Sequence, residues 1–235
     1  MSKLVITTVG ASLLEKDKLK GVKGWIDTKT ENDIDNLIAG NVITQRNYDK
    51  IVQDYFSAVT DLRDYSAEIA SLKLMKLNRD EDRVVLLFSD TPEGAFCARG
   101  NAIYINEHIA QCESVNGTNK DVRKIRGLKI DTAKDFILMG LNNLRAIVVD
   151  LFKNKRDKDE IYFNFTGGYK GEIPLITILA KNWFNGVPLF YLFEPKNKKP
   201  ELIKMIVKEN QIEMYTGKTK EIIEILPNGE VEISG

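Results

Sequence analysis

The sequence predicts an α/β domain with a mostly parallel central sheet and a short C-terminal β-hairpin appendage. Two features of the chain indicate this fold. Short apolar runs alternate with longer segments of helical periodicity over most of the 235 residues. Near the end of the chain, an Asn-Gly pair at 228–229 separates two short strand-like segments, which is typical of a tight hairpin.

Four apolar runs are expected to form the central strands, because runs of this length and composition are typical of strands buried on both faces. They comprise residues 3–9, 83–88, 161–165 and 187–193, the last of which is expected to be the final central strand. The hairpin is expected to comprise residues 222–226 and 231–233.

Three segments have the spacing of amphipathic helices. Residues 47–77 predict one long helix, with the apolar stripe Ile51, Tyr55, Val59, Leu62, Ile69 and Leu72. A second helix, capped by Asp131 or Thr132, has the core stripe Ile137, Leu141, Leu144, Val148 and Leu151. A third helix tolerates Pro174 in its first turn and buries Ile173, Ile176, Ala180 and Trp183. Residues 21–41 and 114–126 are expected to be surface excursions.

The composition excludes several classes of protein. Lys plus Arg and Asp plus Glu number 34 each, so no global field attracts long nucleic acid, although a local pocket can hold a small anion. No apolar run approaches the roughly 20 residues that span a bilayer, so we expect a cytoplasmic protein without membrane contact. Cys97 and Cys112 are expected to be free thiols. The single histidine, His108, excludes a His-rich metal site.

Two glycine turns are the strongest indication of a ligand. Gly10 and Ser12 follow the first strand, whereas Gly167, Gly168 and Lys170 follow the strand at 161–165. A strand that turns through glycine into a helix exposes backbone N–H groups, and Lys170 adds a positive charge. Because carboxyl ends of parallel strands share one edge of a sheet, we predict a phosphate-bearing ligand there. The alternative is a tight connection that binds nothing.

Other polar residues have a structural interpretation beside the functional one. Asp90 and Thr91 follow another strand at the same edge. For this turn, a helix cap is favoured over direct catalysis, and contact with the ligand stays an open alternative. His108 is expected to be structural or superficial. A solvated face is favoured over an anion pocket for the basic residues Arg99, Arg123, Lys124 and Arg126. The absence of P-loop and Gly-x-Gly-x-x-Gly motifs argues against P-loop hydrolysis and ordinary nicotinamide chemistry.

Several motifs together resemble the CARF (CRISPR-associated Rossmann fold) family. Thr-Thr-Val-Gly-Ala-Ser-Leu-Leu at 7–14 is similar to its first motif and Asn-Phe-Thr-Gly-Gly-Tyr-Lys at 164–170 to its second. Between them lie Ser-Asp-Thr-Pro-Glu-Gly at 89–94, Ile-Arg-Gly-Leu at 125–128 and Gly-Leu-Asn-Asn-Leu at 140–144. The resemblance covers residues 1–205 and implies a Rossmann-like three-layer domain, with residues 206–235 as the appendage.

The resemblance further implies a homodimer that binds cyclic oligoadenylate, most often cyclic tetra-adenylate, the messenger of type III CRISPR immunity. The expected ligand-binding residues are Gly10, Ala11, Ser12, Asp90, Thr91, Thr166, Gly167, Gly168, Tyr169 and Lys170. As a ring nuclease, the protein would slowly cleave the ring to linear di-adenylate with a 2′,3′-cyclic phosphate. The ribose 2′-OH would attack, without metal or cofactor, and Lys170 and Ser12 would be catalytic.

Two alternatives stay open. The first alternative is a non-cleaving sensor for an effector that lies outside this chain. The second is an α/β enzyme that acts on another nucleotide. The HEPN ribonuclease motif Arg-x4-His is absent, because Ile103 stands five positions before His108. The ring nuclease is the preferred interpretation, and a tri- or hexa-adenylate ring would use the same residue types.

Overall fold

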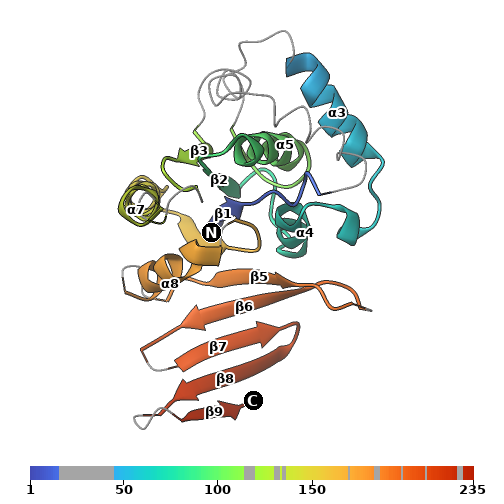
Figure 1. The fold of residues 1–235 in the computed structure, drawn as a ribbon. Coiled ribbons are helices and arrows are strands. Elements are labelled where there is room, and N and C mark those ends of the chain that lie inside the picture. Colours follow the sequence, from blue (N-terminus) through green and yellow to red (C-terminus); the bar gives the residue numbers. More distant parts are fainter. Residues whose placement is uncertain are drawn as a thin grey trace.

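The computed structural model describes residues 1–15, 45–113, 120–129, 133, 136–168, 170–182, 186–196, 198–209, 211–226 and 230–235 of the chain. Within these residues one sheet runs through the molecule, with strand order β3-β2-β1-β4-β5-β6-β7-β8-β9 (Figure 1). The strands from β3 to β5 are parallel to one another, and each strand from β6 onward is antiparallel to the one before it.

The parallel half contains the strands that the apolar runs predict, and one more. Its members are β1 (Ser2–Val9), β2 (Arg83–Ser89), β3 (Val122–Ile125), β4 (Asp159–Asn164) and β5 (Leu189–Phe193). Alternate residues of β1 face opposite sides of the sheet, as the pleat requires. Val5 packs with residues of α3 (Gln45–Ser57), α4 (Ala67–Leu74) and α5 (Pro92–His108). Leu4 packs with residues of α7 (Leu141–Lys153) and α8 (Ile173–Asn182).

The predicted fold class is wrong, because the sheet is mixed and not mostly parallel. After β5 the chain adds β6 (Glu201–Val207), β7 (Gln211–Thr216), β8 (Thr219–Ile225) and β9 (Val231–Ser234), all antiparallel. Figure 1 shows these strands extending away from the helices, so a clear three-layer Rossmann-like fold is not formed. The predicted hairpin appendage is the outer pair of strands of this extension, and the unpredicted strands β6 and β7 lie between it and β5. The domain division at residue 205 stays a prediction.

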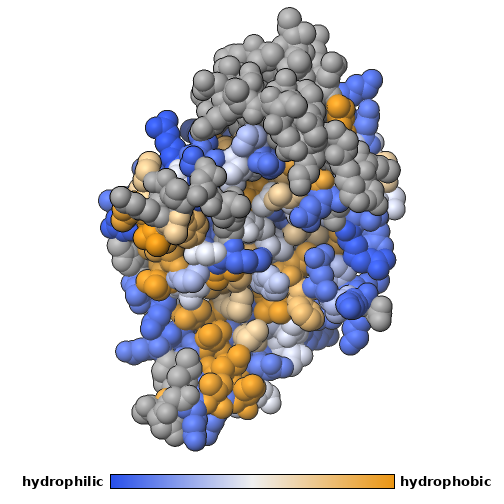
Figure 2. Space-filling model, viewed as in Figure 1, coloured by the Kyte–Doolittle hydropathy of each residue, from blue (hydrophilic) through white to orange (hydrophobic). Residues whose placement is uncertain are grey.

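The antiparallel extension has one apolar face and one polar face. Strand register aligns Val207, Ile212, Ile223 and Ile233 across its four strands on one side. Figure 2 shows hydrophobic residues gathered over this part of the molecule. On the other side, Glu213 of β7 accepts hydrogen bonds from basic and phenolic side chains, namely Lys208 at 2.7 Å, Tyr215 at 2.9 Å and Lys220 at 3.1 Å.

The single long helix predicted for residues 47–77 is wrong, because the segment forms two helices. α3 ends at Ser57, a 3₁₀ turn spans Leu62–Asp64, and α4 begins after Ser66. The Ser66 hydroxyl accepts a hydrogen bond from the Ile69 N–H at 3.2 Å, which is an N-cap. The new helix start places Glu68 in the first turn of α4, where it is fully buried.

A π-helical turn, Phe136–Gly140, precedes α7 and changes which residues are buried. A π turn holds more residues than an α turn, so the apolar stripe does not continue through it in helical register. Leu144, Val148 and Leu151 are buried as predicted, but Ile137 is 56% exposed and its predicted core position is wrong. Asp131, Thr132 and Trp183 lie outside the described residues. Pro174 lies in the first turn of α8, as predicted.

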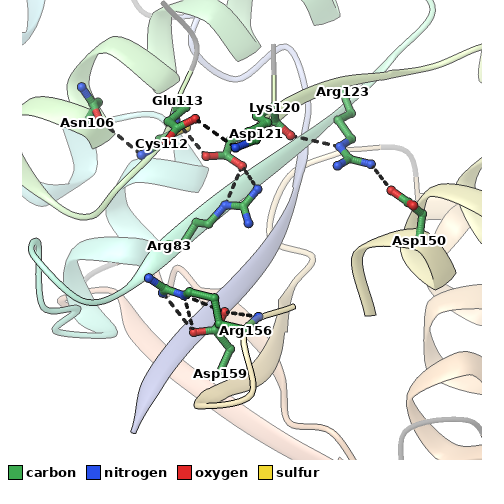
Figure 3. Close-up of polar contacts among 10 residues, drawn as sticks. All are labelled: Arg83, Asn106, Cys112, Glu113, Lys120, Asp121, Arg123, Asp150, Arg156 and Asp159. Carbon is green, nitrogen blue, oxygen red and sulfur yellow. Dashed lines mark hydrogen bonds and ion pairs between the residues drawn. The ribbon is translucent and has the colours of Figure 1, made fainter. Parts of the chain in front are cut away.

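Ion pairs fix the flank of the parallel half around β3 (Figure 3). The buried Asp121 carboxylate accepts hydrogen bonds from Arg83 Nε at 2.7 Å and from the Glu113 N–H at 2.9 Å. Arg123 on β3 reaches Asp150 on α7 at 2.7 Å. Arg123 therefore joins two elements of the fold.

The remaining predictions on composition concern thiols and the membrane. Cys97 and Cys112 are buried free thiols, as predicted, and burial raises the pKa of each well above its usual range. No helix formed by the described residues combines the length and the apolar composition that crossing a membrane requires.

Candidate functional site

The two glycine turns meet at the carboxyl edge of the parallel strands. β1 and β4 are hydrogen-bonded neighbours, with Thr7 opposite Asn164. The turns that follow are so close that a Cβ atom added to Gly10 would lie 2.9 Å from the Gly168 nitrogen. The edge therefore brings together both segments that the sequence singles out, although they are more than 150 positions apart.

A buried carboxylate, Glu68, fills the space between these turns. Its Oε1 atom accepts a hydrogen bond from the Gly10 N–H at 2.8 Å, and its Oε2 atom accepts one from the Ser12 hydroxyl at 2.8 Å. The Asn101 side-chain amide lies 3.5 Å from Oε2. A Cβ atom on Gly167 would come within 1.9 Å of Oε1. Two donors expected to hold an external anion thus hold an anion of the protein itself.

Ser12 is half-buried and held from two sides. Its hydroxyl donates to Glu68 and accepts a hydrogen bond from the Ala67 N–H at 3.2 Å. α4 supplies both partners, because Ala67 and Glu68 are the first two residues of that helix. The neighbouring residue, Ala11, is exposed at the edge.

The second glycine turn is built around its own internal contacts. The Thr166 hydroxyl donates to Asn164 Oδ1 at 2.7 Å and accepts from the Leu192 N–H of β5 at 3.0 Å, so Thr166 joins two strands. Gly168 has φ +88°, and a Cβ atom there would lie 2.1 Å from Glu172 Oε1. Packing against carboxylates therefore requires glycine at both 167 and 168, whether or not a phosphate binds.

Lys170 is exposed beside this turn. It begins the 3₁₀ turn Lys170–Glu172 that leads into α8, and its Nζ atom lies 5.7 Å from the centre of the Tyr191 ring. The Tyr191 ring stacks in turn on Phe165, with centroids 5.9 Å apart. Lys170 thus presents a positive charge at the edge of the sheet, whereas Tyr169 lies outside the described residues.

Asp90 and Thr91 serve the fold at the end of β2. The Thr91 hydroxyl accepts from the Gly94 N–H at 3.1 Å and caps α5, which confirms the favoured structural interpretation. The Asp90 carboxylate accepts from the Gly127 N–H at 2.9 Å and lies 3.7 Å from Lys124 Nζ. Both side chains of this turn are therefore engaged in local contacts.

The remaining basic residue positions and His108 differ in their exposure and in their place in the fold. Arg99 is buried in α5, whereas Arg126 is exposed. His108 is at the far end of α5, whose 17 residues place it roughly 25 Å along the helix from the start at Pro92. Its ring is half exposed and 3.6 Å from Glu107, so His108 is a surface residue, as predicted.

Glu68 is the residue of this edge that sequence reasoning missed. A long helix across residues 47–77 would have placed it on an unremarkable helical face. The signal that could have revealed it is Ser66-Ala67-Glu68, because a serine followed by an acidic residue is typical of a helix start. Reading a break there would have brought Glu68 to the end of a helix facing the first glycine turn.

Comparison with known proteins identifies a family for this chain. A search of curated proteins found no match to this chain. A family model described as CRISPR-associated protein (Cas_APE2256) matches residues 63–205, which is more than half of the chain. The matched region begins just before α4 and includes Glu68, the second glycine turn and Lys170. The chain therefore belongs to the Cas_APE2256 family of CRISPR-associated proteins.

Proposed function

We propose that this CRISPR-associated protein binds a cyclic oligoadenylate at the edge formed by its two glycine turns and cleaves it slowly. Cyclic tetra-adenylate is the favoured ligand, and linear di-adenylate with a 2′,3′-cyclic phosphate is the product. Cleavage would switch off type III CRISPR signalling. The observation that carries the proposal is the contact of the turns after β1 and β4 beside the exposed Lys170, in a chain of a CRISPR-associated family.

The contacts of the site divide the expected ligand-binding residues into two groups. Thr166 and Thr91 use their hydroxyl groups within the fold, so they shape the edge without needing to touch a ligand. Ala11 and Lys170 are exposed there. We therefore assign phosphate contact mainly to the Lys170 ammonium group, which acts as a point charge, and to backbone groups of the turns.

The proposed chemistry is an internal transesterification. The ribose 2′-oxygen forms a bond to phosphorus, and the bond from phosphorus to the 5′-oxygen breaks. Holding these three atoms in line supplies much of the rate, because the nucleophile is part of the substrate. Lys170 stabilises the negative charge that develops on the phosphate oxygens. Two copies around a two-fold axis would cleave two opposite bonds of a four-phosphate ring.

A second candidate function is a sensor that binds the ring without cleaving it. The specific observation that favours it is the occupied first turn, where Gly10 and Ser12 already donate to Glu68. In this alternative the turns would recognise the ring, and the response would come from an effector outside this chain.

A cleavage assay separates the two functions. Purified protein is incubated with cyclic tri-, tetra- and hexa-adenylate, with and without a chelator, and the products are followed by chromatography and mass spectrometry. We expect the chelator to have no effect and cyclic tetra-adenylate to yield di-adenylate. Tight binding without product after many hours would establish the sensor instead. Absence of binding to all three rings would refute both functions.

A further inference from the structure

We propose that Glu68 holds Ser12 as a hydrogen-bond acceptor toward the ribose 2′-hydroxyl and takes up the proton that reaches Ser12 during cleavage. This inference rests on the proposed ring nuclease function. Glu68 is a positioning residue in this scheme, because it is fully buried and acts on the substrate through Ser12.

Glu68 is fully buried, which is rare for a carboxylate side chain. Taking a carboxylate out of water costs several kcal/mol unless hydrogen bonds and charges compensate. Here the Gly10 N–H and the Ser12 hydroxyl both donate to it at 2.8 Å. Ile69 and Leu72 of the same helix are buried in the apolar core, whereas Ser71, three residues beyond Glu68, is a further buried polar side chain. Glu68 is thus a buried hydrogen-bond acceptor that lies directly behind the serine.

The hydrogen bonds of Ser12 fix the direction of its hydroxyl group. A hydroxyl group has one proton to donate and two lone pairs to accept with. Ser12 gives its proton to Glu68 Oε2 and accepts from the Ala67 N–H at 3.2 Å. These contacts leave one accepting position on a half-buried oxygen. A phosphate oxygen is itself an acceptor and does not fit this position, whereas a 2′-hydroxyl is a donor and does.

The proposed proton path runs from the ribose 2′-hydroxyl through Ser12 to Glu68. As the 2′-oxygen forms its bond to phosphorus, its proton moves to the Ser12 oxygen, and the Ser12 proton moves to Glu68 Oε2. The bond from phosphorus to the 5′-oxygen breaks, and that oxygen takes a proton from water. Glu68 then returns its proton through Ser12 to solvent. General-base assistance of this kind contributes roughly 10²–10⁴-fold to a rate.

The test uses Glu68→Gln, Ser12→Ala and the double variant, each compared with wild type for ring affinity and single-turnover cleavage. The glutamine amide can donate to Ser12, which turns the serine proton outward. We expect Glu68→Gln to keep the affinity for cyclic tetra-adenylate within a few-fold and to lower the cleavage rate by roughly 10²–10⁴-fold. Because both residues serve one proton path, the double variant should cleave no more slowly than the slower single variant.

A second measurement stands even if Glu68→Gln does not fold. Ser12→Ala should weaken binding of the ribose ring but not of the 2′-deoxy ring, which lacks the donor. Equal weakening for both rings would show a phosphate contact and overturn the inference. If the wild type cleaves the ring and Glu68→Gln cleaves it at the same rate, the inference about Glu68 is overturned, whereas the ring nuclease function stands. A wild type that binds but does not cleave would refute the ring nuclease, and the proton path with it.

Discussion

Lys170 is the side chain on which the proposed cleavage most depends. Its ammonium group lies over the Tyr191 ring at an exposed position beside the second glycine turn. The ring contact limits where the lysine can point without neutralising its charge. A phosphate that approaches this edge would therefore meet a cation that is already oriented.

Replacing Lys170 with alanine should lower single-turnover cleavage of cyclic tetra-adenylate by roughly 10²–10³-fold, because one donor to the developing charge is lost. The matched control is Lys153→Ala, an exposed lysine at the C-terminal end of α7. Cleavage by the control variant should be unchanged. Wild-type cleavage by the Lys170 variant would remove this residue from the mechanism.

Gly168 allows a second test at the same scale. Gly168→Ala should destabilise the protein by about 2–4 kcal/mol, since alanine is strained at φ +88° and its Cβ would displace the Glu172 carboxylate. Gly217→Ala is the control, because Gly217 has φ +58° with nothing within 4 Å of an added Cβ. Its cost should be only about 1 kcal/mol. Urea unfolding of both variants measures the difference, and equal losses would show that the Glu172 contact is unimportant.

The glycines, Ser12 and Lys170 could be picked out from the sequence because each turn is a local pattern. The role of Glu68 could not, since its hydrogen bond to Gly10 joins residues 58 positions apart. A contact of this kind depends on where α4 starts and on the layer against which it packs. The identity of the ligand also stays a prediction, because the hydrogen bonds around Glu68 join protein groups to one another and do not involve a substrate.

At the scale of elements, strands made of short apolar runs were easier to predict than the buried helix α5 or the partly exposed strands. β1, β2, β4 and β5 are short apolar runs, and the prediction located all four. β6 and β7 were missed, because Glu201–Val207 and Gln211–Thr216 mix charged and apolar residues and most of their side chains are half exposed. The strand pairings that stabilise them are contacts between segments, which periodicity within one segment does not report.

The polar face of the extension predicts a dependence of stability on pH. Hydrogen bonds from Lys208, Tyr215 and Lys220 lower the pKa of Glu213 from 4.5 to about 2. A carboxyl group with a lowered folded-state pKa stabilises the fold above its unfolded pKa, and this contribution is lost as pH falls toward the folded value. Glu213→Gln should therefore have a lower melting temperature than wild type at neutral pH.

The difference between Glu213→Gln and wild type should shrink as pH falls from about 4.5 to about 2, because protonation then removes the charge in both proteins. Glu232→Gln on β9 is the control, since that side chain is exposed at the edge strand. Thermal unfolding followed by circular dichroism over this range gives the comparison. A constant difference across the range would show that the charge of Glu213 does not matter.

At the scale of the whole molecule, we propose that the ring and a dimer of this chain share a two-fold symmetry. A ring of four equivalent nucleotides can present the same phosphate geometry to two identical edges. Titration calorimetry should therefore give one ring per two chains, with light scattering showing a dimer in the complex. One ring per chain would contradict the symmetric site while leaving binding itself intact.

Because one hydrogen-bonded sheet joins the site to the C-terminal strands, protection against amide hydrogen exchange should be graded across it. β9 is exposed on every residue and pairs on one side only, whereas β1 is almost wholly buried between two strands. Local opening should therefore begin at β9 and become less frequent strand by strand toward β5. The step at β5 matters most, since the Leu192 amide is bonded to Thr166 in the second glycine turn. The extension would in this way shield the edge strand of the site from solvent exchange.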